Sequence, residues 1–421
     1  MLKRILSFFL VSLFCAAIYG QKSGIVATYY VDGSKESYQY RSHTSIEAID
    51  QGASVVYATN GVSLNLTKLR MIKSSGGIND PDRRETGINS VLLVDGGSNV
   101  TVEACDVTSH TAQSDAISVT GNETKVKMQD GTVTVSRAGC AAINAIHNGS
   151  IVMDKTIVKT QTGQSPLFYA SNSGSIDITN IMGDSQGQGS PLFHVLSTGS
   201  INASKCKIES AKYTIGNVDG GNMSLYDNEL RSGKDCGFML YGAKSADGHG
   251  LLTLVKNTIQ VDEGPLLMVT NTTADISVSK NKISSKCIDL MIVRADEWGV
   301  EGQNGGHATL HVEEQSLNGN ITVDGISSLL LELNKGGKLN GLINSIENRE
   351  ADVRVVMGAG SSWTSKGDSY VKSIVFKQPI EKGLKQLKGK HTIYYDPNDP
   401  ENAPLGGKEY KTGGGMLRPL K

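Results

Sequence analysis

The chain has 421 residues and a formal net charge of −1, with 41 basic and 42 acidic side chains. Because this balance creates no long-range field that would attract nucleic acid or an anionic membrane surface, we expect neither as a partner. Glycine is abundant (48 residues) while aromatic residues make up 5%, which indicates many turns and small core side chains. A chain of this length usually forms two or three domains, unless a repeat extends one core lengthwise.

The N-terminal segment has the pattern of a secretory signal peptide. Residues 1–4 carry two positive charges, residues 5–17 (ILSFFLVSLFCAA) are apolar, and small Gly20 precedes polar Gln21. The apolar run is too short to span a membrane, and no later run reaches the length of a membrane helix. We therefore predict a signal peptide over residues 1–20 and a secreted or surface-displayed mature chain without a transmembrane segment. Residues 21–43 are expected to cap the fold.

From residue 44 onward, a motif recurs that begins apolar-x-apolar and places another apolar residue about seven positions later. It reads SNVTVEACDV at 98–107, GSIVMDKTIV at 149–158 and ADISVSKNKI at 274–283. The aligned first apolar positions mostly lie 22–29 residues apart, near a period of 25, and are Leu64, Val100, Val126, Ile151, Ile176, Ile201, Met223, Leu252, Ile276 and Leu310. Strand-like alternation at this period predicts a β-solenoid.

Each repeat contains a second apolar run. Its centres are Ile117, Ile143, Phe168, Phe193, Ile215, Met239, Leu267 and Leu290. Two runs in one period predict two parallel sheets, with about 10–12 coils of roughly 25 residues over residues 44–375. A β-sandwich is the alternative, but its strands recur every 8–12 residues without an alignable long repeat. Residues 376–421 fall outside the repeat and are expected to pack on the helix or extend from it.

The coil geometry also bears on the cysteines. Cys105 and Cys206 share one position of the repeat, and Cys236 and Cys287 share another, two coils apart. Two coils correspond to about 10 Å, whereas a disulfide requires Cα atoms within roughly 7 Å. We therefore predict no disulfide and five free thiols in the mature chain.

Four late segments have distinctive sequences, namely the loop at 297–306 (EWGVEGQNGG), SLNGNITVDGISSLLLELNKGGKLNG at 316–341, SSWTSKGDSYVKSI at 361–374 and HTIYYDPNDPENAPLGGKEYKTGGGMLRPLK at 391–421. With the coils from about Thr44, they resemble a family of secreted bacterial β-helix proteins described as adhesin-like. The resemblance covers most of the mature chain. It implies a right-handed parallel β-helix of the pectin-lyase type and a cell-surface location, but no particular reaction.

The pectin-lyase fold also hosts polysaccharide lyases and hydrolases, so a carbohydrate-active enzyme is an alternative. Hydrolysis requires a pair of carboxylates across the glycosidic bond, and the lyases require several acidic calcium ligands. Gly248-His249-Gly250 matches one short hydrolase motif, but no adjacent Asp-Asp pair accompanies it. Outward coil positions are mostly Ser, Thr, Asn and Lys. We therefore assign no catalytic residue and expect no metal and no cofactor.

Function in solenoids concentrates on loops that interrupt the repeat. One insertion covers residues 72–86, and two more follow Met239 and Leu290 at the same corner, two coils apart. One hypothesis is that the last two form a ligand-contacting patch in which Trp298 stacks on a sugar. The favoured alternative is that Trp298 packs against the helix wall and holds its loop down, because tryptophan is usually largely buried. The patch comprises Asp247, His249, Arg294, Asp296, Glu297, Trp298 and His307.

A second anomaly is an apolar stripe that should face outward. With Ile117 and Phe168 directed inward, the alternate residues point away from the core. The stripe comprises Leu167, Tyr169, Leu192, Phe238, Leu240, Leu266, Met268 and Met291. A surface this apolar is not left in water. We expect residues 376–421 to cover it, and the alternative is a surface for a partner or for self-association.

Taken together, the sequence favours a secreted or surface-displayed β-helix that binds glycans or host and extracellular surfaces without catalysis. Two alternatives remain open. One is a carbohydrate-active enzyme of the pectin-lyase fold, and the other is a structural, self-assembling surface component.

Overall fold

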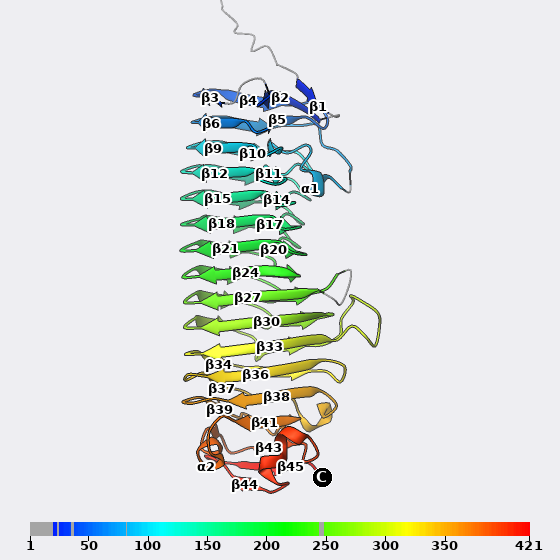
Figure 1. Ribbon diagram of the computed structural model, residues 1–421, viewed down its shortest axis with the longest axis vertical. Helices are drawn as coiled ribbons and strands as arrows, with labels where there is room; N and C mark the ends of the chain where they lie inside the picture. Colours follow the sequence, from blue (N-terminus) through cyan, green and yellow to red (C-terminus); the bar gives the residue numbers. More distant parts are fainter. Residues whose placement is uncertain (1–19, 23–24, 35–37, 81, 244–247) are drawn as a thin grey trace, which may run out of the picture.

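The computed structural model describes residues 20–22, 25–34, 38–80, 82–243 and 248–421. The predicted signal peptide, apart from Gly20, and Asp247 lie outside these residues. The described chain is a β-solenoid of about 15 turns with roughly 25 residues per turn, stacked along one axis (Figure 1). The predicted fold class is confirmed, and the turns outnumber the expected 10–12 because both terminal segments also wind into the solenoid.

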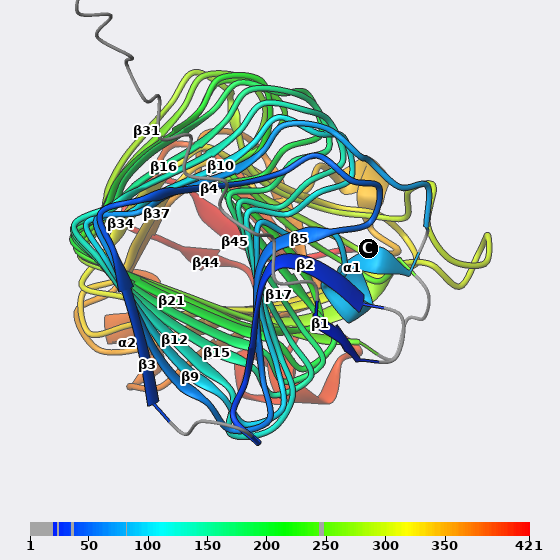
Figure 2. The same cartoon turned by 90° about the horizontal axis from the view of Figure 1, so that it is seen from above.

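Three long sheets run along the solenoid, whereas the sequence pattern predicts two (Figure 2). Each regular turn contributes one strand to sheet A, then one to sheet B and one to sheet C. Sheets B and C coincide with a single apolar run of the sequence because little more than a one-residue bend separates their strands. In one turn, for example, Asp130 takes a left-handed φ of 54° between the strands that end at Gln129 and begin at Thr132.

Sheet A contains β1 (Gly20–Lys22), β2 (Ile25–Asp32), β5 (Ser54–Thr59), β8 (Leu92–Val94), β11 (Ile117–Thr120), β14 (Ile143–Ile146), β17 (Phe168–Ser171), β20 (Phe193–Leu196), β23 (Gly216–Asp219), β26 (Phe238–Tyr241), β29 (Leu267–Thr270), β32 (Asp289–Val293) and β35 (Asn320–Val323). Sheet B contains β3 (Tyr38–Ser42), β6 (Ser63–Thr67), β9 (Asn99–Glu103), β12 (Lys125–Gln129), β15 (Ser150–Asp154), β18 (Ser175–Thr179), β21 (Ser200–Ser204), β24 (Gly221–Tyr226), β27 (His249–Val255), β30 (Thr272–Ser279), β33 (Gly306–Glu313), β36 (Ser328–Asn334), β38 (Asp352–Met357) and β41 (Ser373–Phe376). Sheet C contains β4 (Ser45–Ala48), β7 (Arg70–Lys73), β10 (Asp106–Ser109), β13 (Thr132–Val135), β16 (Ile157–Thr160), β19 (Met182–Ser185), β22 (Lys207–Ser210), β25 (Glu229–Ser232), β28 (Thr258–Val261) and β31 (Lys282–Ser285).

Beyond β31, sheet D takes the place of sheet C, and sheet E lies at the C-terminal end. Sheet D contains β34 (Ser316–Asn318), β37 (Lys338–Asn340), β39 (Ser362–Thr364) and β42 (Leu387–Lys388), and sheet E contains β40 (Ser369–Val371), β43 (Thr392–Tyr395), β44 (Tyr410–Lys411) and β45 (Met416–Pro419). The helical segments are short, namely α1 (Arg83–Thr86), η1 (Ile346–Asn348), α2 (Ile380–Leu384) and η2 (Pro400–Leu405). Within the described ranges, no helix is long and apolar enough to cross a membrane.

The core consists of columns of equivalent side chains, because parallel in-register pairing places each residue over its counterpart in the next turn. In sheet A one inward column contains Phe168 and Phe193, whose rings stack with centroids 5.7 Å apart. Gly216 follows in this column, and a Cβ there would lie 2.7 Å from the sulfur of Met223 and 2.9 Å from the ring of Phe238. Neighbouring large side chains therefore occupy the space that glycine leaves.

The strand pairing in this column shows that the prediction of an outward apolar stripe is wrong for most of its residues. Phe238 pairs with Gly216 and so points inward, whereas the sequence pattern assigns Met239 to the inward side. A slip of one residue moves every side chain of a strand to the opposite face. Such a slip places Phe238, Leu240 and Met291 in the core. Leu167, Leu192 and Leu266 are buried for another reason, because each precedes the first residue of its strand and lies at the corner where the turn enters sheet A. Tyr169 and Met268 belong to the outward column, so no continuous apolar stripe faces outward in the described chain.

Both terminal segments are built into the solenoid. In the segment 21–43, β2 and β3 form the first turn and pair in parallel with β5 and β6, while β1 lies antiparallel along β2. Residues 376–421 extend the other end, where β42, β43 and β45 continue the parallel stacking and β44 turns back antiparallel along β45. The C-terminal segment therefore extends the solenoid and does not cover the outer face of sheet A (Figure 1).

Buried polar side chains link the turns at the corner between sheets B and C. The Asn257 amide oxygen accepts hydrogen bonds from the backbone N–H of Asn228 (2.9 Å) and from its side chain (2.9 Å), and Asn257 donates to the amide oxygen of Asn281 (3.0 Å). Cys206 stands one turn before Asn228, whose side chain accepts from the Cys206 N–H at 2.9 Å. Cys206 is therefore buried in the same column of side chains as Asn228 and Asn257.

The described cysteines Cys105, Cys140, Cys206, Cys236 and Cys287 are all free. Burial raises the pKa of Cys140 and of Cys206 to about 11 and also raises that of Cys105 and Cys236. Because the thiolate is the reactive form, we expect only the half-buried Cys287 to react quickly in the folded protein. A colorimetric thiol titration of the mature chain, residues 21–421, should therefore give one fast thiol under native conditions and five in denaturant. Fewer than five in denaturant without reductant would contradict the assignment.

Candidate ligand-binding groove

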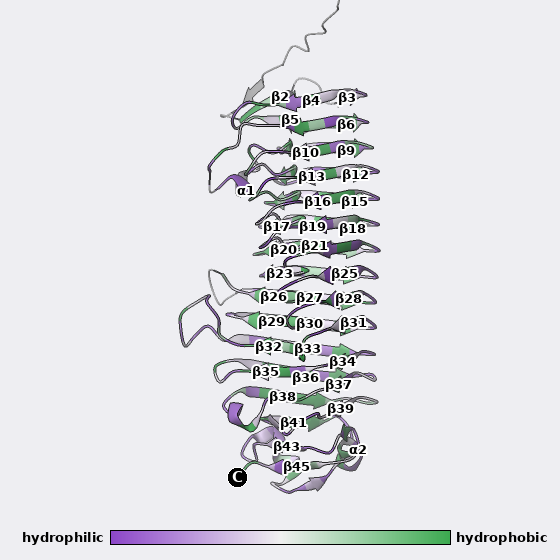
Figure 3. Cartoon of the chain, turned by 180° about the vertical axis from the view of Figure 1, so that it is seen from behind, coloured by the Kyte–Doolittle hydropathy of each residue, from purple (hydrophilic) through white to green (hydrophobic). Residues whose placement is uncertain are grey.

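Two loops lie over the outer face of sheet A. The first, residues 74–91, joins β7 to β8 and contains α1, and the second, residues 294–305, joins β32 to β33. Both project from the same side of the solenoid (Figures 1 and 2), and α1 is among the most hydrophilic segments there (Figure 3). They coincide with two of the insertions expected from the sequence. The third insertion, between β26 and β27, contains Asp247, which lies outside the described residues.

Helix α1 is held down by side chains from later turns. The Asn144 amide donates to the carbonyl oxygen of Arg84 at 2.9 Å, and Asn172 donates to the Glu85 carboxylate at 2.7 Å. The Tyr169 hydroxyl also donates to Glu85, at 3.4 Å. Gly87 ends the helix with a left-handed φ of 71°. These bonds place α1 across the outer faces of β11, β14 and β17.

The surface beneath α1 is polar and buried. Asp115 accepts from the backbone N–H of Ala141 (2.6 Å) and from the amide of Asn144 (3.0 Å), and the hydroxyl of Ser90 donates to that of Ser118 (2.7 Å). Buried polar groups of this kind are stable only when paired, so the network fixes both the helix and the turns below it.

Trp298 anchors the second loop instead of presenting a free face. Its ring lies 4.9 Å from that of Tyr241 at an angle of 44°, and it packs against the cluster of Cys236, Met239 and Tyr241. The Asn304 side chain closes the loop by donating to the carbonyl oxygens of Asp296 (2.6 Å) and Trp298 (3.0 Å). The structure thus supports the alternative in which Trp298 holds its loop against the wall.

The other members of the predicted patch do not converge on one site. His249 and His307 occupy the same outward position of sheet B with Thr273 between them, and they bind Asp275 (3.1 Å) and Ser328 (2.9 Å) respectively. Arg294 pairs with Asp296 at 3.2 Å. Asp296 and Glu297 line a hollow of about 660 Å³ that Asp324 also borders. No group of three or more metal-ligating side chains occurs among the described residues.

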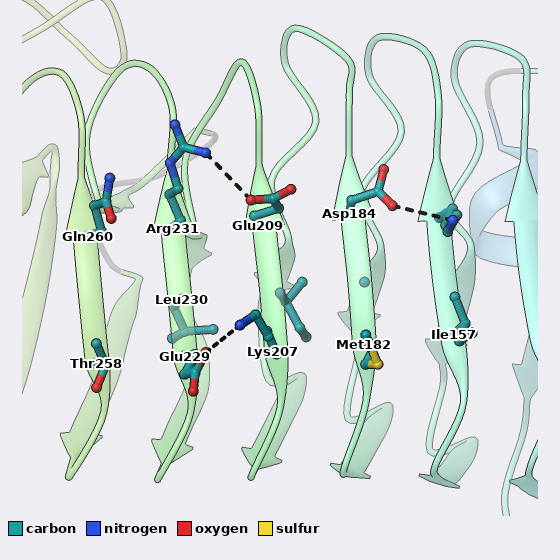
Figure 4. A pocket seen from close by; sticks show the side chains of 13 residues that line it. Ile157, Met182, Asp184, Lys207, Glu209, Glu229, Leu230, Arg231, Thr258 and Gln260 are labelled. Carbon is teal, nitrogen blue, oxygen red and sulfur yellow. Dashed lines mark ion pairs between the residues drawn. The ribbon is translucent and has the colours of Figure 1, made fainter.

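Sheet C carries a shallow groove of about 470 Å³ on its outer face (Figure 4). Its charged side chains neutralise one another between neighbouring strands, with Lys207 and Glu229 at 2.9 Å and Arg231 and Glu209 at 3.6 Å. Met182 is 58% exposed at one end. Exposed ion pairs of this kind contribute little and are typical of a solvated face.

A groove that the sequence analysis missed lies where the turns from sheet C enter sheet A. It consists of two adjoining hollows of about 350 and 460 Å³, which share Gln164. The first is lined by Arg83, Arg84, Glu85, Gln113, Gly139, Gln164 and Tyr169, and the second by Ala138, Gly163, Gln164, Gln188, Gly189 and Tyr213. We call the pair the turn groove.

The turn groove forms because glutamine and glycine alternate at one position of successive turns. Successive turns place Gln113, Gly139, Gln164 and Gly189 there, all with left-handed φ between 55° and 76°. A Cβ at Gly139 would meet Gln113 at 3.7 Å and Arg83 at 3.4 Å, so the missing side chain opens the space between two glutamines. Since turns are about 4.8 Å apart, the hollows recur at roughly 10 Å. The alternation can be read from the sequence, but a single turn with a glycine or a glutamine looks ordinary and does not indicate a groove.

Between the two loops, the outer face of sheet A carries the aromatic side chains of Tyr169, His194 and Tyr241. The guanidinium of Arg84 covers the ring of Tyr169 at 4.9 Å, and that ring meets His194 edge-on at 5.4 Å. His194 hydrogen-bonds the Tyr241 hydroxyl at 3.2 Å. Burial raises the pKa of Tyr169 to about 12, and burial together with the charge of Arg84 lowers the pKa of His194 to about 3. Neither group therefore titrates near neutral pH.

Comparison of the chain with known protein families, with curated proteins and with solved structures found no match. The parallel β-solenoid architecture is established by the strand pairing itself.

Replacing Trp298 with alanine should release the loop 294–305. The variant loses the contacts with the cluster of Cys236, Met239 and Tyr241, and we expect unfolding to become easier by about 1–3 kcal/mol and proteolysis within the loop to accelerate. Limited proteolysis followed by mass spectrometry locates the cleavage. Val300→Ala is the matched control, because Val300 lies in the same loop and is 66% exposed. Equal cleavage rates for the two variants would contradict the anchoring role.

His194 should make stability depend on pH. Its pKa is about 3 in the folded protein against an ordinary value of 6.5, so the unfolded chain binds a proton before the folded chain does. The contribution of neutral His194 to the free energy of unfolding is therefore fully present above about pH 6.5 and is lost as the pH drops towards 3. Urea unfolding between pH 7.5 and 4.5 should show a smaller decline for His194→Asn, whose side chain cannot take a proton. An identical decline would exclude His194 as a contributor.

Proposed function

We propose that this protein is an exported, non-catalytic β-helix protein of the adhesin-like kind, which binds a linear glycan in the turn groove. The basic, apolar and small-residue order of residues 1–20 supports export, and the resemblance of residues 44–421 supports the adhesin-like class. The observation that carries the binding function is the pair of adjoining hollows generated by the Gln113, Gly139, Gln164 and Gly189 alternation.

A repeating surface is suited to a repeating ligand. The hollows follow the solenoid axis at a spacing of roughly 10 Å, so they present similar groups to successive units of an extended polymer. Gln164 contributes to both hollows and can contact two adjacent units. A globular partner would not require this periodicity.

The lining chemistry favours sugars. A glutamine amide both donates and accepts hydrogen bonds, as a sugar hydroxyl does, and Gln113, Gln164 and Gln188 provide three such groups. The half-exposed ring of Tyr213 gives an apolar face with a polar tip, on which the C–H face of a sugar ring can rest. A few polar groups around an aromatic surface are typical of ligand sites.

Binding without catalysis is favoured because the groove lacks a carboxylate pair. Glu85 is the one carboxylate among the described residues that line the two hollows, and Asn172 holds it at 2.7 Å. Glycoside hydrolysis requires two carboxyl groups on opposite sides of the bond. The carbohydrate-active enzyme remains the competing function and is an outcome of the test.

The test is a glycan-array screen of the mature chain, followed by calorimetry with the best oligosaccharide. Gln164→Gly should weaken binding about tenfold or more, corresponding to the loss of one or two hydrogen bonds at roughly 1 kcal/mol each. The fold tolerates this change because Gly139 and Gly189 already occupy the equivalent position. Gly189→Gln should also weaken binding, by filling the second hollow.

Gln260→Ala on the outer face of sheet C is the matched control and should leave affinity unchanged. Absence of binding to any glycan would refute the proposed function. Unaltered affinity in both groove variants would place the site elsewhere. Release of shorter sugars during incubation, followed by chromatography, would establish the enzyme instead.

A further inference from the structure

Two arginines at the N-terminal end of the turn groove have no acidic partner among the described residues. Arg83 and Arg84 line the first hollow, and neither takes part in any of the ion pairs found there or elsewhere in the described ranges. Arg83 is only 9% exposed. By contrast, Arg231 lies 2.6 Å from Asp262, and Arg354 lies 2.8–3.1 Å from three carboxylates. Buried arginines are normally paired, so this arrangement requires an explanation.

The protein satisfies only part of their hydrogen-bonding capacity. Both guanidinium groups donate through Nη2 to the same carbonyl oxygen, that of Gly139, with Arg84 at 3.2 Å. The Nε atoms of Arg83 and Arg84, and Oε1 of Gln113, are buried without a hydrogen-bond partner. A guanidinium has five N–H donors, and each buried donor left unpaired carries an uncompensated desolvation cost.

The nearby carboxylates are already committed to other groups. Glu85 also lines the first hollow, but its carboxylate accepts from Asn172 at 2.7 Å and lies 3.5 Å from His147. Asp115 lies beneath α1 and accepts from Ala141 at 2.6 Å and from Asn144 at 3.0 Å. Desolvation lowers the pKa of Arg83, and Asp115 offsets part of that effect without contacting it directly.

We propose that the first hollow binds a negatively charged substituent of the glycan, a carboxylate or a sulfate ester, through Arg84 and Arg83. This inference rests on the proposed function and specifies its ligand class. The planar fork of a guanidinium matches two oxygens of such a group, and the buried surroundings strengthen the contact. No charged side chain is among the described residues that line the second hollow. The preferred ligand is therefore a linear glycan with an acidic unit next to a neutral one.

The test compares oligosaccharides of equal length that are neutral, carboxylated or sulfated, by calorimetry at low and high salt. The wild-type protein should bind one or both acidic forms at least tenfold more tightly than the neutral form, and salt should reduce that preference. Arg84→Gln should abolish the preference, because it should weaken the binding of the acidic forms more than the binding of the neutral form. Arg84→Lys should restore only part of it, because an ammonium lacks the planar fork.

Arg70→Gln provides the matched control, since Arg70 is exposed on sheet C and the change in charge is the same. The relative affinity for carboxylated and sulfated forms identifies which substituent the hollow takes. Equal binding of neutral and acidic forms would overturn the inference while leaving the proposed function intact. A loss of neutral binding equal to the loss of acidic binding in Arg84→Gln would also overturn it. Absence of binding to any form refutes the proposed function itself. The salt dependence of the wild-type protein tests the inference even if the variants fail to fold.

Discussion

In-register hydrogen bonding between successive turns is the constraint from which the other features of this protein derive. It places every residue directly above its counterpart one turn earlier, so side chains form columns instead of isolated contacts. The stacked rings of Phe168 and Phe193 show how a column is filled, and Gly216 shows how one turn yields space to its neighbours. The same rule acts on the surface, where the residues at one position of successive turns form a continuous row along the axis.

The outer face of sheet A departs from the regular pattern because the two loops cover parts of it. Beneath α1 the outward column is polar and buried, with Ser118 and Asn144 in the hydrogen-bond network. Beneath the loop 294–305 it is apolar, and Met268 and Trp298 both pack against the cluster that contains Met239. Each loop has a surface adapted to it, so both loops are built-in parts of the structure. The turn groove begins at the first loop and extends towards the second, with Tyr213 at its far end.

The sequence was sufficient to predict the solenoid because a period near 25 requires repeated winding of the backbone. It did not reveal the third sheet, because a bend centred on one left-handed residue such as Asp130 leaves no gap in the apolar pattern. The predicted centres Ile215, Met239 and Leu290 are each displaced by one residue, since Gly216, Phe238 and Met291 occupy the inward column, while Leu267 lies inward as predicted. Pattern alone cannot identify a glycine as a core residue.

The residues of the predicted ligand-contacting patch are divided between two sheets, for a related reason. Loops that leave the same corner were expected to share a site, but His249 and His307 belong to the face of sheet B while Trp298 packs on sheet A. Corner proximity does not determine the direction in which a side chain points. The burial of Arg83 and Arg84 was equally hidden, because it depends on bonds to residues more than 50 positions away, such as Gly139.

The alternation of glutamine and glycine gives the surface a repeat of two turns, while the core repeats with every turn. Duplication of a single turn would preserve the hydrophobic columns but bring two like residues together in the turn groove. Duplication of two turns, about 50 residues, would preserve both and add one hollow. In a protein of this design, the groove is therefore lengthened without interruption only when turns are duplicated in pairs, so that an even number of added turns preserves the alternation.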